Sequence, residues 1–336
     1  MRNKSPVKLT LIAVVALLLL ILPLMVDNYL IHVVNQVGIF IILTSALNIM
    51  VGYTGQLSFV HVGLFAIGAY TSSILSIDLG LPFLVALPIA AVAAAIIGFL
   101  IGFPALRFKT HFFAIVTLAF AEIIRLLIYN LRDLTGGPNG IYSIPFPESF
   151  LWFDFSQRSH FYYITLFFVV ITLVFVRYLI GTRTGKAMLA VRENETFAKF
   201  IGINTWKVKM TAFTISAFIA GIAGSLFAHY NSYISPYSFT IADSVTFLLM
   251  VIIGGMGTIV GPIVGTAFLT FLPEMLRSVA DLRMVIYGLL LILTIMFLPR
   301  GIVGLFKDLY AYFQIKKSPE KPIFKDMEGG KQDVGS

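Results

Sequence analysis

The chain has 336 residues, of which 58% are hydrophobic and only 12% are charged. Because soluble domains carry roughly 25% charged residues, this composition excludes an ordinary soluble protein and indicates a multi-pass membrane protein. The chain has no cysteine, which excludes disulfides, thiolate metal sites and cysteine nucleophiles. A formal net charge of +8 is a common sign of nucleic-acid binding, but its distribution along the chain gives another explanation.

Two apolar spans are predicted near the N-terminus. Residues 1–8 carry three basic residues and no acidic one, and an apolar run over residues 9–26 follows them. A basic start before an apolar run is also the pattern of a signal peptide, but this run is long for one and has no clear cleavage site. We therefore predict a first span over residues 9–26, with the N-terminus inside, and a second span over residues 30–50.

The segment of residues 52–74 combines four glycines with several polar side chains. Because glycine weakens helices and polar groups are costly in lipid, this pattern predicts an interrupted helix that faces other protein or a water-filled path. Close helix packing through small residues is the alternative, and both can hold. His61 alone is equally well explained as a hydrogen-bonded packing residue. We favour a role in lining a translocation path, for which the candidates are Asn48, Thr54, Gln56, Ser58 and His61.

The next two spans carry a packing signal and a charged pair. A span that ends near Pro104 contains Gly98 and Gly102, a spacing that lets helices approach closely. The following span, over residues 111–131, places Glu122 and Arg125 three residues apart on one helix face, where they can pair. Charge within a membrane is by default a sign of function, but we favour a structural ion pair because the two charges neutralise each other near the outer surface.

Residues 132–159 form one long predicted external loop. Its Gly-Gly-Pro-Asn-Gly run is a turn signal, because it lacks the Lys-Ser/Thr of a phosphate-binding loop. Its aromatic second half either lies in the membrane interface or contacts an external partner, and we favour the interface.

The hydrophilic segment of residues 181–209 lies between predicted spans over residues 160–180 and 210–230. It carries six basic and two acidic residues, so we predict that it lies on the cytoplasmic side.

This segment also has the pattern of a short folded helix. Asn194 is a suitable N-cap, and Glu195 suits the first helical turn. Phe197, Phe200 and Ile201 recur at helical spacing and form one apolar face, after which Gly202 can close the helix. Such a helix either rests on lipid headgroups or docks onto a partner.

The C-terminal third contains two short apolar runs within residues 244–273, joined by a glycine-rich stretch over residues 254–262. We predict two short spans that meet at an inner turn, with a re-entrant hairpin as the alternative. A last span is predicted over residues 284–298. The polar tail of residues 307–336 is predicted to be cytoplasmic and disordered.

The charge distribution tests this arrangement. With ten spans and both termini inside, the inner segments together carry +11, Arg177 near the inner end of its span carries +1, and the outer turns carry −4, which gives the net charge of +8. Almost all of the excess positive charge therefore falls on one side, as expected for a membrane protein, and explains the net charge without nucleic acid. We predict an all-α polytopic membrane protein of about ten transmembrane helices, some short or interrupted, with a transmembrane domain over residues 1–306.

No catalytic motif is present. The sequence has no H-E-x-x-H, no nucleophile elbow and no Walker A motif, so we predict no enzyme activity, no metal site and no cofactor on this chain. Three classes remain: the membrane subunit of an ATP-driven importer, a secondary transporter, and a membrane enzyme or scaffold. A secondary transporter needs acidic groups in the membrane for its coupling ion, and only Glu122 qualifies. The predicted docking helix favours the importer.

Stretches along nearly the whole chain resemble the LivM-type permeases of the branched-chain amino acid ABC importer family. No single stretch is specific for this family, but the stretches together are. The matching stretches are residues 47–71, 111–127, 134–141, 183–204, 229–239, 248–268 and 298–306. Phe59 and Val60 before His61 depart from the pattern, since many relatives have a glycine there, which bears on backbone packing at that point.

The resemblance implies an importer in the bacterial inner membrane. This chain would pair with a related LivH-type permease, and two ATPase subunits that bind ATP and Mg²⁺ would dock on its cytoplasmic side. An external solute-binding protein would deliver leucine, isoleucine or valine, although relatives also carry urea, short amides or other amino acids. Residues 181–209 would be the ATPase-coupling loop, with coupling residues Glu195, Phe197, Ala198, Phe200, Ile201 and Gly202.

Overall fold

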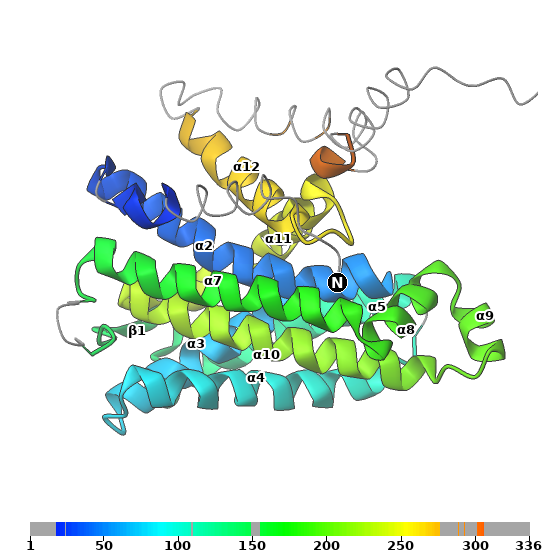
Figure 1. Ribbon diagram of the computed structural model, residues 1–336. Coiled ribbons are helices and arrows are strands. Elements are labelled where there is room, and N and C mark those ends of the chain that lie inside the picture. The colour runs from blue at the N-terminus through cyan, green and yellow to red at the C-terminus, as the bar shows by residue number, and fades with distance from the viewer. Residues whose placement is uncertain are drawn as a thin grey trace, which may run out of the picture.

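The computed structural model describes residues 18–148, apart from 24 and 109, residues 155–275, and residues 288, 292 and 301–305. These residues are almost entirely helical (Figure 1). Among the described residues, six helices are long and apolar enough to cross a membrane: Asn28–Tyr53, Phe83–Ala105, His111–Asn130, Arg158–Gly181, Thr205–Asn231 and Pro236–Gly254. The all-α membrane fold is therefore confirmed. Most of the predicted first span, nearly all of the last span and the tail lie outside the described residues, so the count of ten spans stays a prediction.

The long helices run side by side along one common direction (Figure 1). They are α2 (Asn28–Asn48), α3 (His61–Ile77), α4 (Phe83–Ala105), α5 (Thr110–Asn130), α7 (Arg158–Gly181) and α10 (Thr205–Asn231). α10 packs against α3 and α4, and α2 packs against α7 and α10. The buried and the exposed faces of these helices are both apolar. Hydropathy therefore predicts where each span lies in the sequence, but not which of its faces packs against the other helices.

Small residues set the close approach of these helices. A Cβ at Gly98 would lie 2.4 Å from the Cβ of Ala217, and one at Gly102 would lie 2.8 Å from the ring of Phe213. Both contacts join α4 to α10, so the close-packing role predicted for these two glycines is confirmed.

The loop predicted to be external lies at the end of the bundle opposite α9 (Glu195–Phe200) (Figure 1). The loop forms a short helix α6 (Arg132–Thr135), a 3-10 turn (Gly137–Asn139) and a strand β1 (Ile141–Tyr142), which pairs antiparallel with β2 (Tyr233–Ile234) after α10. Gly136, Gly137 and Gly140 all have positive φ, which confirms the predicted turn. This two-residue ribbon is the one departure from an all-α fold among the described residues.

The last described pair of helices, α11 (Ile241–Gly254) and α12 (Gly261–Met275), pack against each other and against α2. A Cβ at Gly254 would lie 1.9 Å from the carbonyl oxygen of Gly261, so the two helices cross at backbone contact. The two predicted apolar segments are therefore helices joined by a glycine-rich turn. Whether they form two short spans or a re-entrant hairpin stays a prediction.

Candidate functional site

Two short helices form the hydrophilic segment between α7 and α10. α8 (Arg183–Glu193) begins at Thr182, whose hydroxyl accepts a hydrogen bond from the amide of Gly185 at 3.2 Å. α9 (Glu195–Phe200) begins at Asn194, whose side-chain oxygen accepts one from the amide of Phe197 at 2.9 Å. The predicted N-cap is therefore confirmed, and Gly202 has the predicted left-handed conformation, with φ of 87°.

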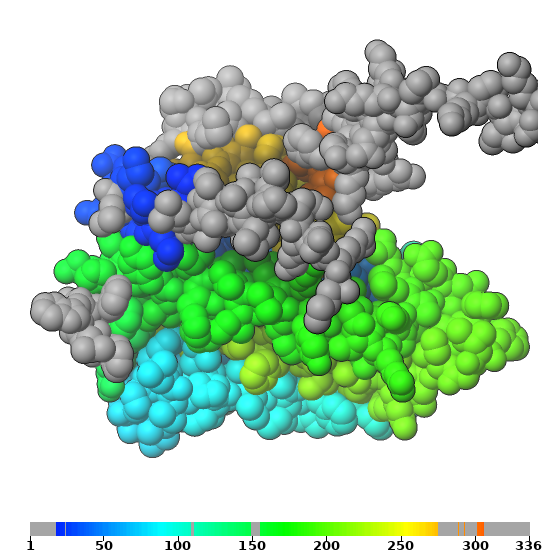
Figure 2. Space-filling view, viewed as in Figure 1, coloured from blue at the N-terminus to red at the C-terminus, as the bar shows by residue number. Residues whose placement is uncertain are grey.

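The large apolar side chains of α9, and that of Ile201 directly after it, point away from the rest of the subunit. Phe200 is 84% exposed, Phe197 63% and Ile201 58%, whereas Ala198 is buried against the subunit. Figure 1 shows α9 standing out at the end of the bundle, and Figure 2 shows the same end as a projecting lobe. Large apolar side chains gathered on a projecting helix are typical of an interaction surface.

Glu195 fastens α9 to the start of α10. Its carboxylate accepts a hydrogen bond from the ammonium group of Lys209 at 2.6 Å and one from the hydroxyl of Thr205 at 3.2 Å. Lys199 lies 3.4 Å from the same carboxylate. The side chain of Lys209 is only 5% exposed and that of Glu195 is 35% exposed, so the lysine end of the pair is shielded from water, and the pair gives α9 a defined orientation on the bundle.

The charge on Glu195 makes this attachment depend on pH. Burial raises the pKa of Glu195, but hydrogen bonds and attraction from Lys209 and Lys199 outweigh it, so the pKa lies below its usual value of 4.5. A carboxyl whose pKa is lowered by folding stabilises the fold above its usual pKa, and that stabilisation is lost as the pH falls through the lowered value. We expect hydrogen–deuterium exchange across α9 to be slow near neutral pH and to accelerate below 4.5, after correction for intrinsic rates.

Glu195→Gln is the control for this effect, because it keeps the shape and removes the charge. Its α9 should exchange faster than the wild type near neutral pH and should show no further acceleration on acidification. Identical exchange in the two proteins near neutral pH would show that the ion pair does not hold α9.

An interruption in the helical path follows α2. The helix widens into a π-helix (Ile49–Tyr53), and non-helical chain then leads to α3 at His61. The hydroxyl of Thr54 and the amide of Gln56 both donate to the carbonyl oxygen of Met50, at 2.6 and 3.1 Å. The predicted interrupted helix is confirmed. Single π-turns occur often at functional sites, because they break the regular hydrogen-bond ladder.

All five side chains predicted to line a path are buried within the subunit. His61 contacts the hydroxyl of Ser58 at 3.0 Å through Nδ1 and that of Ser216 at 3.0 Å through Nε2. Asn48 contacts the turn between α11 and α12. These bonds stabilise the interruption between α2 and α3, and a place on a translocation path stays a prediction.

Glu122 and Arg125 lie on α5 and face each other. The Nε of Arg125 donates to the carboxylate of Glu122 at 2.9 Å, and a second contact joins Nη2 to the other oxygen. Both side chains are partly exposed, at 29% and 22%. The structural role of this ion pair stays a prediction.

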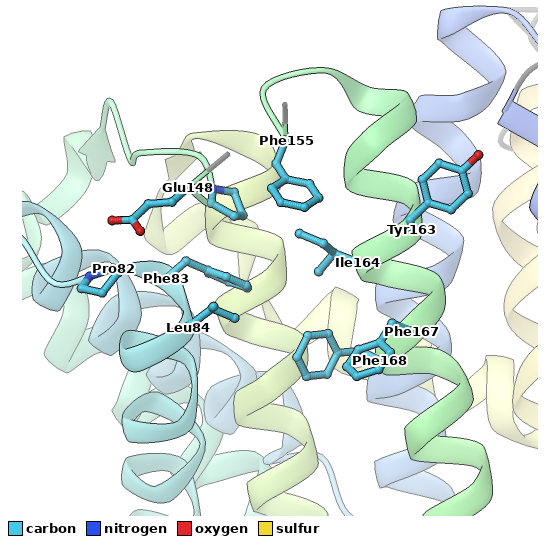
Figure 3. A pocket seen from close by; sticks show the side chains of 10 residues that line it. Pro82, Phe83, Leu84, Glu148, Phe155, Tyr163, Ile164, Phe167 and Phe168 are labelled. Atoms are coloured by element: carbon cyan, nitrogen blue, oxygen red, sulfur yellow. The ribbon is translucent and has the colours of Figure 1, made fainter. Parts of the chain in front are cut away.

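Two cavities lie at opposite ends of the bundle. A polar cleft of about 1030 Å³ lies between the end of α4, α9 and the start of α10. An apolar cavity of about 610 Å³ lies between the start of α4 and the start of α7, where Phe83, Ile164 and Phe168 face one another (Figure 3). The polar cleft brings Arg107, Lys199 and Lys209 together, with Glu195 beside them. The placement of this end on the cytoplasmic side stays a prediction.

Sequence reasoning missed α8 and the role of its last turn. Arg192 donates a hydrogen bond from Nη1 to the carbonyl oxygen of Gly52, at the end of α2. Thr182 as an N-cap, with Met188 and Val191 three residues apart on the buried face, was the available signal for the helix. The contact itself joins residues 140 positions apart and leaves no trace in the local pattern.

The apolar helices of spanning length and the folded basic segment at one end define a multi-pass, helical membrane protein. The chain belongs to the family described as the permease component of branched-chain amino acid transport systems, whose model matches residues 29–295.

Relatives with assigned names cover most of the chain. The high-affinity branched-chain amino acid transport system permease protein LivM of Escherichia coli K12 is 38% identical, over 89% of this chain and 76% of the relative. The probable LivM of Methanocaldococcus jannaschii is 26% identical, over 85% and 92%. The LivH permease protein of E. coli K12 is 28% identical, over 76% and 90%. No solved structure matched the chain.

Proposed function

We propose that this chain is one of two related permease subunits of an ATP-driven importer of branched-chain amino acids in the bacterial cytoplasmic (inner) membrane. The similarity of the chain to both LivM and LivH supports a pair of related permeases, since both names belong to one transport system in E. coli. The family description and the name of the LivM relatives support leucine, isoleucine and valine as substrates.

The exposed apolar face of α9 is the observation that supports coupling to ATP. Two ATPase subunits dock on the cytoplasmic side, bind ATP and Mg²⁺, and hydrolyse ATP, while this chain binds no cofactor. The proposed coupling residues are Glu195, Phe197, Ala198, Phe200, Ile201 and Gly202. Phe197, Phe200 and Ile201 form the contact surface, while Glu195 and the buried Ala198 keep α9 in place.

The proposed topology has about ten transmembrane helices, with both termini in the cytoplasm. It consists of a permease domain over residues 1–306 and a cytoplasmic tail over residues 307–336. The charge distribution supports it, because the basic residues gather at the end that carries α8 and α9. A solute-binding protein delivers the substrate at the opposite end, near the external loop.

Substrate uptake tests the proposal. Uptake of labelled leucine is measured in cells with the gene deleted and then restored, with urea and glutamate as parallel substrates. A protonophore and an ATP-depleting agent are applied in separate arms. We expect deletion to remove high-affinity leucine uptake, and we expect the restored uptake to follow the ATP level rather than the proton gradient.

Two other outcomes would change the proposal. A loss of urea uptake with normal leucine uptake would keep the importer and replace its substrate. Uptake that follows the proton gradient would overturn ATPase docking at α9 and favour an ion-coupled secondary transporter.

A further inference from the structure

Arg192 lies at a junction of three segments that are far apart in the sequence. It is in the last turn of α8, two residues before the N-cap of α9. Its backbone and side chain approach Gly55, in the non-helical segment after α2, where a Cβ would lie 3.4 Å from the Cγ of Arg192. Its guanidinium group reaches both the end of α2 and the turn between α11 and α12.

The contact with α2 satisfies a carbonyl group that the helix leaves open. Gly52 is in the last turn of the π-helix, where carbonyl groups lose their partners within the helix. The Nη1 of Arg192 donates to this carbonyl oxygen. A positive charge at the C-terminal end of a helix is also favoured by the helix dipole. Arg192 therefore binds the interrupted end of α2 both by hydrogen bonding and by charge.

Asn48 extends this connection to the turn between α11 and α12. Its side-chain oxygen accepts a hydrogen bond from the amide of Gly257 at 2.9 Å, and its amide group donates to the carbonyl oxygen of Thr258 at 2.9 Å. One side chain thus pairs with both a donor and an acceptor of the same turn. The turn cannot move along α2 without breaking these bonds.

No free space separates the three segments. A Cβ at Gly257 would lie 2.2 Å from Nη1 of Arg192 and 2.7 Å from the carbonyl oxygen of Gly52. A Cβ at Gly52 would lie 2.4 Å from the amide nitrogen of Gly257. Segments in such direct contact transmit a displacement instead of absorbing it, because close-packed interiors have low compressibility.

We propose that Arg192 is the positioning residue that carries movement of α8 and α9 into the membrane. Movement of α9 displaces the last turn of α8, the guanidinium group moves the interrupted end of α2, and Asn48 moves the turn between α11 and α12 with it. This inference rests on the proposed ATP-driven function. It goes beyond that function because it assigns the transmission of movement to Arg192. This residue lies outside the exposed face of α9 that the ATPase would contact.

The test compares transport with ATP hydrolysis in the complete importer, reconstituted in liposomes with its ATPase and solute-binding subunits. The quantity measured is leucine taken up per ATP hydrolysed. We expect Arg192→Ala to lower this ratio at least tenfold while ATP hydrolysis continues, and Arg192→Lys to restore part of it by keeping one charged donor. Arg177→Ala is the matched control. Arg177 is another exposed arginine, at the cytoplasmic end of α7, and its removal should leave the ratio unchanged.

A double variant separates transmission from simple stabilisation. If Arg192 and Asn48 act in series, Arg192→Ala combined with Asn48→Ala should lower the ratio no more than Arg192→Ala alone. An unchanged ratio in Arg192→Ala, or losses that add in the double variant, would overturn the proposal. Loss of ATPase binding in both Arg192→Ala and Arg192→Lys would overturn it as well, since Arg192 would then act in docking. A wild-type importer whose uptake ignores ATP would instead refute the proposed function.

Discussion

Phe200→Asp should abolish ATP-driven leucine uptake while the permease remains inserted in the membrane. Phe200 is 84% exposed, so its replacement leaves the interior of the subunit intact. In a complex, a carboxylate at this position would face an apolar partner surface without a counter-charge. Loss of a central aromatic contact commonly costs about 2 kcal/mol or more, and about 1.4 kcal/mol corresponds to a tenfold change in binding, so uptake should fall at least about tenfold. Uptake assays and immunoblots of membranes measure the two quantities.

Phe200→Leu is the matched control, because it keeps an apolar side chain and should keep most of the uptake. Gly202→Pro should resemble Phe200→Asp, since proline cannot adopt the φ of 87° and removes the amide that donates to the carbonyl oxygen of Lys199 at 3.0 Å. Normal uptake by a well-expressed Phe200→Asp variant would rule out ATPase docking at α9.

Gly224→Val should destabilise the helix bundle. Gly224 is on α10 where it crosses α3, and a Cβ there would lie 2.0 Å from the carbonyl oxygen of Phe65 and 2.7 Å from the amide nitrogen of Ala69. Since the obstructing atoms are backbone, the helices must separate rather than adjust a side chain. Such overpacking costs about 1–3 kcal/mol and occasionally more, so we expect a melting temperature in detergent lower by roughly 5 °C or more.

Gly181→Val provides the comparison for this variant. A Cβ at Gly181, at the end of α7, has no neighbour within 4 Å, so valine there should leave the melting temperature nearly unchanged. Size-exclusion chromatography of heated samples measures both variants under the same conditions. Equal melting temperatures for Gly224→Val and the wild type would show that α3 and α10 can separate freely at this crossing.

Features that depend on neighbouring residues were predictable from the sequence. Asn194 and Gly202 mark the ends of α9 because capping uses groups within one helical turn. The glycines and polar residues after Gly52 predicted the interruption before α3, because these residue types weaken a helix wherever it lies. Hydrophobic length likewise predicted the positions of the long helices.

Features that depend on distant contacts were not predictable. The π-helix at the end of α2 lies against the turn between α11 and α12, some 200 residues later in the chain. No sequence pattern within Ile49–Tyr53 predicts it. Polarity marked Ser58 and His61 as unusual in a membrane span, but not whether they face a path or a protein partner. The structure pairs them with each other and pairs His61 with Ser216, a residue that no local sequence pattern connects with them.

The shortness of α3 has a consequence for the thickness of membrane that it covers. Its 17 residues extend about 26 Å, less than the roughly 30 Å of a hydrocarbon layer, so we expect part of the non-helical segment before it to lie at hydrocarbon depth. The amide of Phe59 in that segment donates to the hydroxyl of Thr117 on α5 at 3.1 Å. An acyl chain offers no acceptor to replace that hydroxyl. We therefore expect α5 to stay against this segment when the subunit moves, so that the two travel as one body.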